Sequence, residues 1–316
     1  MIVSITHEHD LDGLGSQAII QRYFNLNQEI HPDEIRCFYA HYIDFVEKIS
    51  IILDSEALPS QLIISDIGFN EDFVGLFSVF KNAKKQGCKI SWFDHHIVDD
   101  LIKEKLRNLV HIYSNDTKKC AAEIIKDYYL PDDPIASKIA EFARDTDFRT
   151  NIYKLASDLQ LIIGFNRGDQ KAQNKRRIVE LLSQGDFENS WFSSQLKILK
   201  KWHEDESTVA LNNAKFIPMK SFGKIVISWA KIGGGRIANL LKERFPDAKA
   251  RIGIDTRHNE IIIHSDFINC RDFARTFKGG GHKVRAGFKY PQIFEKDNML
   301  NESFIDDIKE SFLKQT

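Results

Sequence analysis

Short apolar runs alternate with amphipathic stretches along the first half of the chain, and this alternation predicts its fold. Apolar runs of strand length cover residues 2–6, 62–65 and 88–93. Apolar residues that recur on one helical face predict helices over residues 16–24, 71–86, 121–129 and 135–144. Strands that alternate with helices favour an α/β fold, in which a mainly parallel, doubly wound sheet has helices on both faces.

The C-terminal third has a different pattern and predicts a second, smaller unit. Apolar runs at residues 224–229, 250–254 and 260–264 predict three strands. A glycine cluster at 233–235 precedes a predicted helix over residues 236–245, and a second glycine cluster follows at 279–281. This mixture of strands, helices and glycine loops is typical of an α+β domain.

A long helical pattern over residues 186–213 separates these two regions. We interpret it as a helix that connects two domains, and a core helix of the first domain is the alternative. The sequence therefore predicts a first domain at residues 1–185, a connecting helix or linker at 186–214 and a second domain at 215–316. We expect a cleft between the two domains.

Composition and charge narrow the classes of partner. The chain has 316 residues and a formal net charge of −1, so it lacks the overall positive field that binds long duplex nucleic acid. No apolar stretch approaches the ~18–20 residues that span a bilayer, so we expect no membrane partner. The four cysteines form no CxxC pair and fit reduced, mostly buried thiols. Because Glu8 and Asp10 lie near the N-terminus without a basic leader, we expect no signal peptide and a cytoplasmic location.

Side chains that bind metals follow each of the three N-terminal apolar runs. Parallel strands end at the same edge of a sheet, so these side chains are expected to lie close together. Carboxylate oxygens suit hard cations such as Mg²⁺, and imidazole shifts the preference towards Mn²⁺, Co²⁺ or Zn²⁺. The pattern therefore predicts a divalent metal site. In chain order the three sets are His7, Asp10 and Asp12, then Asp66, then Asp94, His95 and His96.

The first of these sets lies in a glycine-containing segment. Gly13 and Gly15 predict a sharp turn, and Ser16 is placed to cap the next helix, whose free N–H groups would face a phosphate. An acidic surface turn with a helix cap is the alternative interpretation. For Asp66 taken alone, an ordinary loop aspartate after a strand is the simpler interpretation.

The third set, Asp94-His95-His96, ends an apolar run that reads as a buried strand. Adjacent residues in an extended chain point to opposite sides, so the two histidines are expected to differ in role. One can bind a metal while the other contacts a phosphate oxygen, and Asp94 can orient an imidazole.

Asp145 and Asp147 follow the predicted helix at 135–144. Carboxylates at a helix C-terminus are unfavourable because the dipole there prefers cations, so a bound cation would explain them. Pairing with Arg144 is the alternative. With Asp145 as the last ligand, the set predicts two metal sites ~3.5–4 Å apart that share one carboxylate and activate a bridging water. The predicted ligands are His7, Asp10, Asp12, Asp66, His95 and Asp145.

Taken in order, these motifs resemble the DHH phosphoesterase superfamily over most of the chain. The resemblance rests on Thr6-His7 with Asp10-Leu11-Asp12-Gly13 and Ser16, on Asp66, on Asp94-His95-His96, on Asp145-Thr146, and on Gly279-Gly280-Gly281-His282-Lys283-Val284-Arg285-Ala286-Gly287. The last segment resembles the GGGH loop of the DHH-associated domain. The two-domain size is similar to that of the compact nanoRNase and pAp-phosphatase branch.

The resemblance implies a cytosolic phosphodiesterase that uses two divalent ions, with Mn²⁺ first and Mg²⁺ or Co²⁺ as alternatives. By position, Asp66 would bridge the ions, His95 would bind one of them, and His96 would contact the scissile phosphate. Gly280, Gly281 and His282 would hold the far part of a nucleotide. Three glycines followed by His282, with Arg285 nearby, also favour an anion-binding loop on chemical grounds.

Two positions leave choices open within the family pattern. Only Glu8 and His9 separate His7 from Asp10, and His9 is an alternative ligand to His7. In the same way, Asp147 is an alternative to Asp145. His264-Ser265 stands where relatives often have an Arg-Ser pair. The substrate contact that the arginine makes in relatives would then fall to Arg285 or Arg257.

The first functional hypothesis is an exonuclease that hydrolyses short oligonucleotides to nucleoside monophosphates, like a nanoRNase or oligoribonuclease, with pAp phosphatase as a further activity. Its partner would be a short oligonucleotide or nucleotide, and a homodimer is one option. The alternatives are a phosphodiesterase for cyclic di-AMP or its linear product pApA, a type II inorganic pyrophosphatase, and an inactive nucleotide-binding relative. An inactive relative is expected to lack one or more ligands, and all are present.

Overall fold

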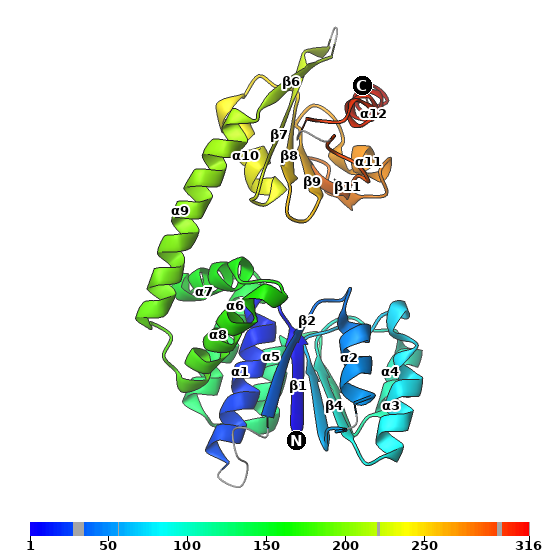
Figure 1. The fold of residues 1–316 in the computed structure, drawn as a ribbon, viewed down its shortest axis with the longest axis vertical. Helices are drawn as coiled ribbons and strands as arrows, with labels where there is room; N and C mark the ends of the chain where they lie inside the picture. Colours follow the sequence, from blue (N-terminus) through cyan, green and yellow to red (C-terminus); the bar gives the residue numbers. More distant parts are fainter. Residues whose placement is uncertain (28–34, 56, 220–221, 296–298, 316) are drawn as a thin grey trace. The chain divides into compact units, whose positions relative to one another are not determined.

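The computed structural model of the protein describes residues 1–27, 35–55, 57–219, 222–295 and 299–315. The chain forms two compact units, which are Met1–Lys197 and Ile198–Thr316 (Figure 1). Each unit has its own sheet and its own hydrophobic core. Among the described residues, no helix has both the length and the apolar character needed to cross a membrane.

Unit 1 contains a five-stranded sheet in the order β2-β1-β3-β4-β5, and every neighbouring pair is parallel. This confirms the predicted parallel α/β fold. The three predicted strands are β1, β3 and β4, while β2 and β5 were not predicted. The strands are β1 (Ile2–His7), β2 (Ile35–Ala40), β3 (Gln61–Ser65), β4 (Lys89–Asp94) and β5 (Ile112–Asn115).

Helices cover both faces of this sheet, which makes unit 1 doubly wound (Figure 1). Successive residues of a strand face opposite cores: Ile63 and Phe93 pack with α1, α5, α6 and α8, whereas Ile64 and Trp92 pack with α2, α3 and α4. The helices are α1 (Leu11–Leu26), α2 (Phe45–Leu53), α3 (Leu76–Lys85), α4 (Asp100–Leu109), α5 (Ala121–Tyr129), α6 (Pro134–Asp147), α7 (Lys154–Phe165) and α8 (Ala172–Gln184), with short 3₁₀ turns at Glu71–Phe73 and Asp169–Lys171.

Helix α1 begins earlier than predicted, so the expected turn at Gly13 and Gly15 and the expected cap at Ser16 are wrong. Asp10 is the N-cap, and its carboxylate accepts a hydrogen bond from the N–H of Gly13 at 3.0 Å. Gly13 allows α1 to lie against β1, because a Cβ there would be 2.1 Å from the carbonyl oxygen of His7. Helix packing, not a turn, therefore explains this glycine.

Helix α6 extends beyond its predicted end. Asp133 caps its first turn by accepting from the N–H of Ala136 at 2.7 Å, and Pro134 occupies the first helical position. The helix continues to Asp147, so Asp145 and Asp147 lie in its last turn and not after it. The predicted helix at 71–86 is a 3₁₀ turn followed by α3.

Unit 2 has a six-stranded mixed sheet in the order β10-β11-β9-β8-β7-β6, in which β7 and β8 are parallel and the other pairs are antiparallel. The three strands predicted for this region correspond to β7, β8 and β9. The elements are β6 (Lys215–Pro218), β7 (Lys224–Ala230), α10 (Gly234–Arg244), β8 (Ala250–Asp255), β9 (Glu260–His264), α11 (Cys270–Arg275), β10 (Gly280–Gly281), β11 (Arg285–Lys289) and α12 (Glu302–Leu313).

The boundary between the units falls inside the long helix α9 (Ser190–Asn212). In unit 2, α11 and α12 contribute to the main core with the inward side chains of β8 and β9, and α10 packs on the opposite face against β8 and β9. Gly253 permits that close approach, because a Cβ there would be 2.1 Å from the carbonyl oxygen of Gly234.

Candidate metal centre

The predicted metal ligands converge where β1, β3 and β4 end. The register pairs Thr6 with Ser65 and Ser65 with Phe93, so the residues that follow these strands meet at one edge of the sheet. Within the described part of the chain, four groups of three side chains have ligand atoms within 4.8 Å of one another, and all four lie at this edge.

The first group combines His7, Asp10 and Asp66. His7 Nδ1 lies 3.1 Å from Asp10 Oδ2 and 3.5 Å from Asp66 Oδ2. Burial alone would lower the pKa of His7, but the adjacent carboxylates of Asp10 and Asp66 raise it to about 10. In turn, burial opposes ionisation of Asp10, while the bond from His7 lowers the pKa of that carboxyl to about 2. Two carboxylates thus favour positive charge at this position.

Two further groups share His95, one with Asp12 and Asp147 and the other with Asp66 and His96. His95 Nε2 is 3.5 Å from Asp12 Oδ2 and 3.4 Å from Asp66 Oδ1, and His95 Nδ1 is 3.7 Å from Asp147 Oδ2. Asp12 is anchored by the N-terminus of α5, because its oxygens accept from the N–H groups of Ala121 and Ala122, each at 2.8 Å. Helix α5 therefore holds Asp12 towards His95.

Asp66 belongs to the group of His7 and Asp10 and also to one of the two groups of His95. Its Oδ2 faces His7 and its Oδ1 faces His95, which is the arrangement of a carboxylate that bridges two ions. Asp66 is 2% exposed, and its backbone has a left-handed φ of 55°. Few residues other than glycine adopt this conformation without strain. The strained backbone sets the position of the Asp66 side chain. Asp66 Oδ2 is buried without a hydrogen-bond partner. A cation would satisfy this atom.

The electrostatics of the site also fit a cation. Burial and then the charge of Asp10 raise the pKa of Asp66 to about 8, and burial and the charge of Asp66 raise the pKa of Asp12 well above its ordinary value. These crowded carboxylates resist ionisation together because they repel one another. A divalent ion would relieve that repulsion, so the donor set fits a metal.

His96 differs from His95 in its surroundings, as expected for adjacent residues. Its Nδ1 lies 2.7 Å from Oδ1 of the buried Asp94, and its side chain is 40% exposed. Burial would lower the pKa of His96, but the hydrogen bond to Asp94 raises it. Tyr42 lies nearby, with ring centroids 6.3 Å apart, and its hydroxyl accepts from the N–H of Gly68 at 3.0 Å. Asp94 thus orients His96, and Nε2 is the ring nitrogen left for a ligand.

Asp145, which we expected to bind a metal, lies apart from the other candidate ligands. Its oxygens accept from the Thr150 hydroxyl at 2.5 Å and from the N–H groups of Ile152 and Tyr153 at 2.7 and 3.0 Å. It belongs to none of the ligand groups, whereas Asp147, two residues later on α6, lies beside His95. Asp145 fixes the α6–α7 turn, so Asp147 replaces it as the ligand candidate.

His7 and His9 also differ in position. His7 faces the two carboxylates, whereas His9 lies outside that group and packs against His41, with ring centroids 4.2 Å apart and the rings tilted by 38°. Burial, followed by the charge of Arg167, lowers the pKa of His9 to about 3. The geometry therefore favours His7 over His9 as the ligand of the carboxylate-rich site.

A buried ion pair beside the site was not predicted. The Lys175 ammonium contacts the carboxylate of Glu8, and Lys175 is fully buried on α8. Lys175 Nζ also donates to the carbonyl of Gly168 at 3.0 Å, and the Gly168 N–H donates to Glu8 Oε1 at 3.1 Å. Its signal in the sequence is weak: Lys175 shares one helical face with Ile178 and Leu182, an unusual place for a cation.

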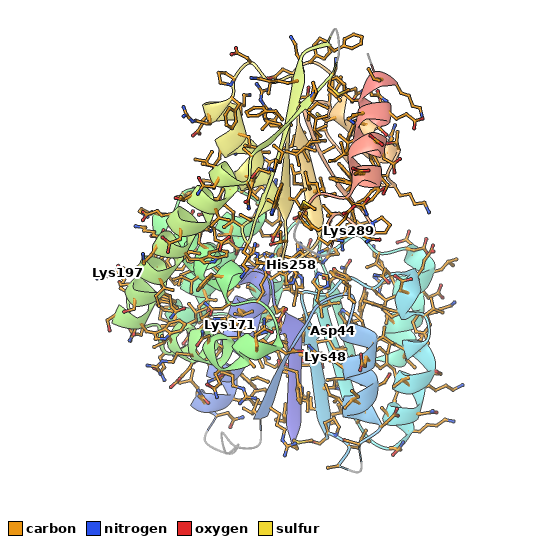
Figure 2. The ribbon with its side chains drawn as sticks, turned by 45° about the horizontal axis from the view of Figure 1, so that its top comes forward. Asp44, Lys48, Lys171, Lys197, His258 and Lys289 are labelled. Carbon is orange, nitrogen blue, oxygen red and sulfur yellow. The ribbon has the colours of Figure 1, made fainter. Side chains whose placement is uncertain are left out.

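Further contacts join the α7–α8 turn to neighbouring segments. Arg167 Nη2 donates to the carbonyl oxygen of His9 at 3.0 Å. Lys48 of α2, which is labelled beside Asp44 in Figure 2, donates to Asp169 at 3.0 Å and to the carbonyl of Tyr39 at 2.8 Å. These bonds and the Glu8–Lys175 pair hold the segment that follows β1 against α8.

The remaining predicted residues lie in unit 2. Gly280 and Gly281 form the short strand β10, so the expected glycine loop is partly a hairpin; the turn is closed by the His282 N–H, which donates to the Arg285 carbonyl at 2.7 Å. Arg285 pairs in register with His264 on β9. Its guanidinium lies against Gly235, where a Cβ would be 1.7 Å from Nη2.

The fold and the ligand set define a two-unit α/β protein with a candidate metal centre at the carboxyl ends of a parallel sheet. Residues 1–144 match the DHH family, N-terminal domain. This match relates residues 1–144 to a family whose phosphoesterases are metal-dependent.

Solved structures show the same fold over nearly the whole chain. The DHH domain of a member of a family of ribosomal proteins has a TM-score of 0.60 and 14% identity, covering 99% of this chain and 85% of that one. The pGpG-specific phosphodiesterase PggH from Vibrio cholerae has a TM-score of 0.52 and 10% identity, covering 100% and 98%. No curated protein matches the chain. At these identities the similarity shows the fold.

Proposed function

We propose that the protein is a metal-dependent phosphodiesterase that hydrolyses short oligonucleotides to nucleoside monophosphates. The observation that carries the proposal is Asp66, whose two carboxylate oxygens face two different ligand groups at the same sheet edge. Paired cation sites with a shared carboxylate are suited to the in-line displacement of phosphate esters. The match of residues 1–144 to a phosphoesterase family supports this class of reaction.

The residues divide into two coordination sets. His7, Asp10 and Asp66 would hold one ion. Asp12, Asp66 and His95 Nε2 would hold the other, and Asp147, which groups with Asp12 and His95, is the further ligand candidate. Mixed carboxylate and imidazole donors favour Mn²⁺ over Mg²⁺, with Co²⁺ as an alternative. Bound ions would supply a water of lowered pKa and would offset the charge that develops on the phosphoryl oxygens.

His96 would act on the phosphate directly. Asp94 holds Nδ1 of this 40% exposed side chain, so Nε2 is the nitrogen that can meet a phosphoryl oxygen. Because the pKa of His96 is raised, the ring carries a proton more readily there and can donate a charge-assisted hydrogen bond. His96 therefore binds and orients the scissile group in this proposal.

We propose that unit 2 is a DHH-associated domain that binds the part of the substrate remote from the ions. Its β8, β9 and β11 align Arg251, His264 and Arg285 in register, and Lys242 Nζ lies 3.5 Å from His264 Nε2. Arg251 is buried and donates to the carbonyls of Phe245 and Pro246, and burial lowers the pKa of His264. The exposed Lys242 and Arg285 are therefore the cations that would meet an anionic chain of a few phosphates. Arg285 pairs in register with His264, the position where relatives have an arginine, and Gly280, Gly281 and His282 belong to the adjoining hairpin.

One structural neighbour supports a narrower alternative. The similar structure from Vibrio cholerae is described as pGpG-specific, which favours a linear dinucleotide such as pApA, or the cyclic di-AMP that precedes it, as the substrate. Both alternatives need the same ions and differ in how unit 2 would hold the second base. The free cysteines agree with action in the reducing cytoplasm.

A turnover panel with Mn²⁺ tests the proposal. RNA of two to five nucleotides, longer RNA, 3′-phosphoadenosine 5′-phosphate, cyclic di-AMP and pyrophosphate would be compared with the wild type and with Asp66→Asn. We expect the shortest RNA to be preferred and the variant to lose turnover with its fold intact; asparagine tolerates the left-handed backbone at this position. Preference for pyrophosphate, or equal turnover by the variant, would contradict the proposal.

A further inference from the structure

A three-histidine group lies beside the carboxylate-rich sites, and His7 is the member of it that the proposed reaction uses. Ring nitrogens of His7, His9 and His41 lie within 4.8 Å of one another. The ring centroids are 4.2 Å apart for His9 and His41, 5.0 Å for His7 and His9, and 6.0 Å for His7 and His41. The three rings come from the ends of the neighbouring strands β1 and β2, and all are partly buried.

The donors in this group differ in kind from those of the neighbouring sites. The group contains three imidazoles and no carboxylate, whereas the groups built on Asp66 each contain at least one carboxylate oxygen. Nitrogen ligands prefer borderline ions such as Ni²⁺, Zn²⁺ or Co²⁺, while oxygen-rich sets favour Mn²⁺ and Mg²⁺. Adjacent groups of donors are therefore expected to select different ions.

The contacts of His41 leave one ring nitrogen for an ion. The N–H of Ile43 donates to His41 Nδ1 at 3.3 Å, so Nε2 is the nitrogen available. Binding through Nε2 would move the ring proton to Nδ1 and would sacrifice only this long, exposed contact. The backbone N–H of His41 donates to Asp44 at 2.7 Å, which holds the residue at the end of β2.

His7 belongs to both groups. A neutral imidazole offers one lone pair to a metal, so His7 can serve one ion at a time. Its Nδ1 faces Asp10 and Asp66, and an ion bound by the three histidines must therefore take His7 from those carboxylates. We propose that His7, His9 and His41 form a site for a borderline divalent ion, and that occupation of this site displaces the ion held by His7, Asp10 and Asp66.

This proposal does not depend on the hydrolase assignment, because it is tested by binding to the metal-free protein. Ni²⁺ and Mn²⁺ affinities would be measured by calorimetry for the wild type, His41→Ala, Asp66→Asn and the control His258→Ala, an exposed histidine of unit 2 labelled in Figure 2. We expect His41→Ala to weaken the Ni²⁺ affinity at least about tenfold and to leave the Mn²⁺ affinity unchanged. Asp66→Asn is expected to weaken the Mn²⁺ affinity and to leave the Ni²⁺ affinity unchanged. The control is expected to change neither affinity.

Displacement has its own readout. Free Mn²⁺ gives a sharp six-line electron paramagnetic resonance spectrum, so Ni²⁺ added to the Mn²⁺-loaded wild type is expected to release Mn²⁺ at concentrations that release none from His41→Ala. Equal Ni²⁺ affinity or equal release in the two proteins would overturn the proposal. Parallel weakening of Ni²⁺ and Mn²⁺ by His41→Ala would also overturn it, because His41 would then support the carboxylate sites and not a site of its own.

Discussion

The buried pair of Glu8 and Lys175 makes a strong prediction about the stability of unit 1. The side chains are 9% and 0% exposed, and Lys175 also bonds to the Gly168 carbonyl at 3.0 Å. Lys175→Met would remove the ammonium group and leave the Glu8 carboxylate buried without its partner. Breaking such a pair costs about 3–5 kcal/mol. In a unit of this size each kcal/mol lowers the melting temperature by roughly 2–4 °C, so we expect a fall of about 6–20 °C.

Urea and thermal unfolding of the metal-free protein, followed by circular dichroism, would measure this loss. Arg177→Met on the same helix is the matched control, because its pair with Glu180 is exposed and contributes at most ~0.5 kcal/mol. The double variant Glu8→Gln/Lys175→Met is expected to be more stable than Lys175→Met, since it leaves no unpaired charge. A loss below about 1 kcal/mol for Lys175→Met, or a double variant no more stable than the single one, would refute the reasoning.

Three further outcomes follow from the contacts at the ends of α6. Asp147→Asn is expected to reduce Mn²⁺ affinity with stability unchanged, and unchanged affinity by calorimetry would exclude Asp147 from the site. Asp145→Asn is expected to lose about 1–3 kcal/mol on urea unfolding, because an amide cannot accept all three bonds, and a loss only in metal affinity would reverse the two roles. The bond from Arg22 lowers the pKa of Asp133, so this pair stabilises unit 1 above the unfolded pKa and that stabilisation is lost as the pH falls through the lower folded pKa. Asp133→Asn should therefore weaken the pH dependence of unfolding below about pH 4, and an unaltered slope would argue against it.

The elements that the sequence indicated share one property, which is a continuous apolar run or face. Strands β1, β3 and β4 are buried at nearly every position and each contains three large apolar residues, so the signal is strong. Strand β2 lies at the sheet edge, carries Arg36 and is partly exposed, so its pattern is mixed. Because β2 was not predicted, its following residue His41 could not be assigned to the site.

The candidate site was predictable where ligands directly follow strands. Asp66, His95 and the segment from His7 to Asp12 met this condition, and the structure brings them together. The choice between Asp145 and Asp147 depends on where α6 ends and which face turns inwards, and a shift of two residues on a helix reverses that face. The Glu8–Lys175 pair joins residues far apart in the chain, so local patterns carry no information about it.

The central claim is that the carboxylate of Asp66 joins two cations. Electron paramagnetic resonance of the metal-free protein titrated with Mn²⁺ tests this most directly, because two bridged Mn²⁺ ions are magnetically coupled and an isolated ion is not. The account predicts two Mn²⁺ bound per chain with a coupled spectrum, and loss of the coupling in Asp66→Asn. A single bound ion, or two ions whose spectra remain uncoupled in the wild type, would contradict it.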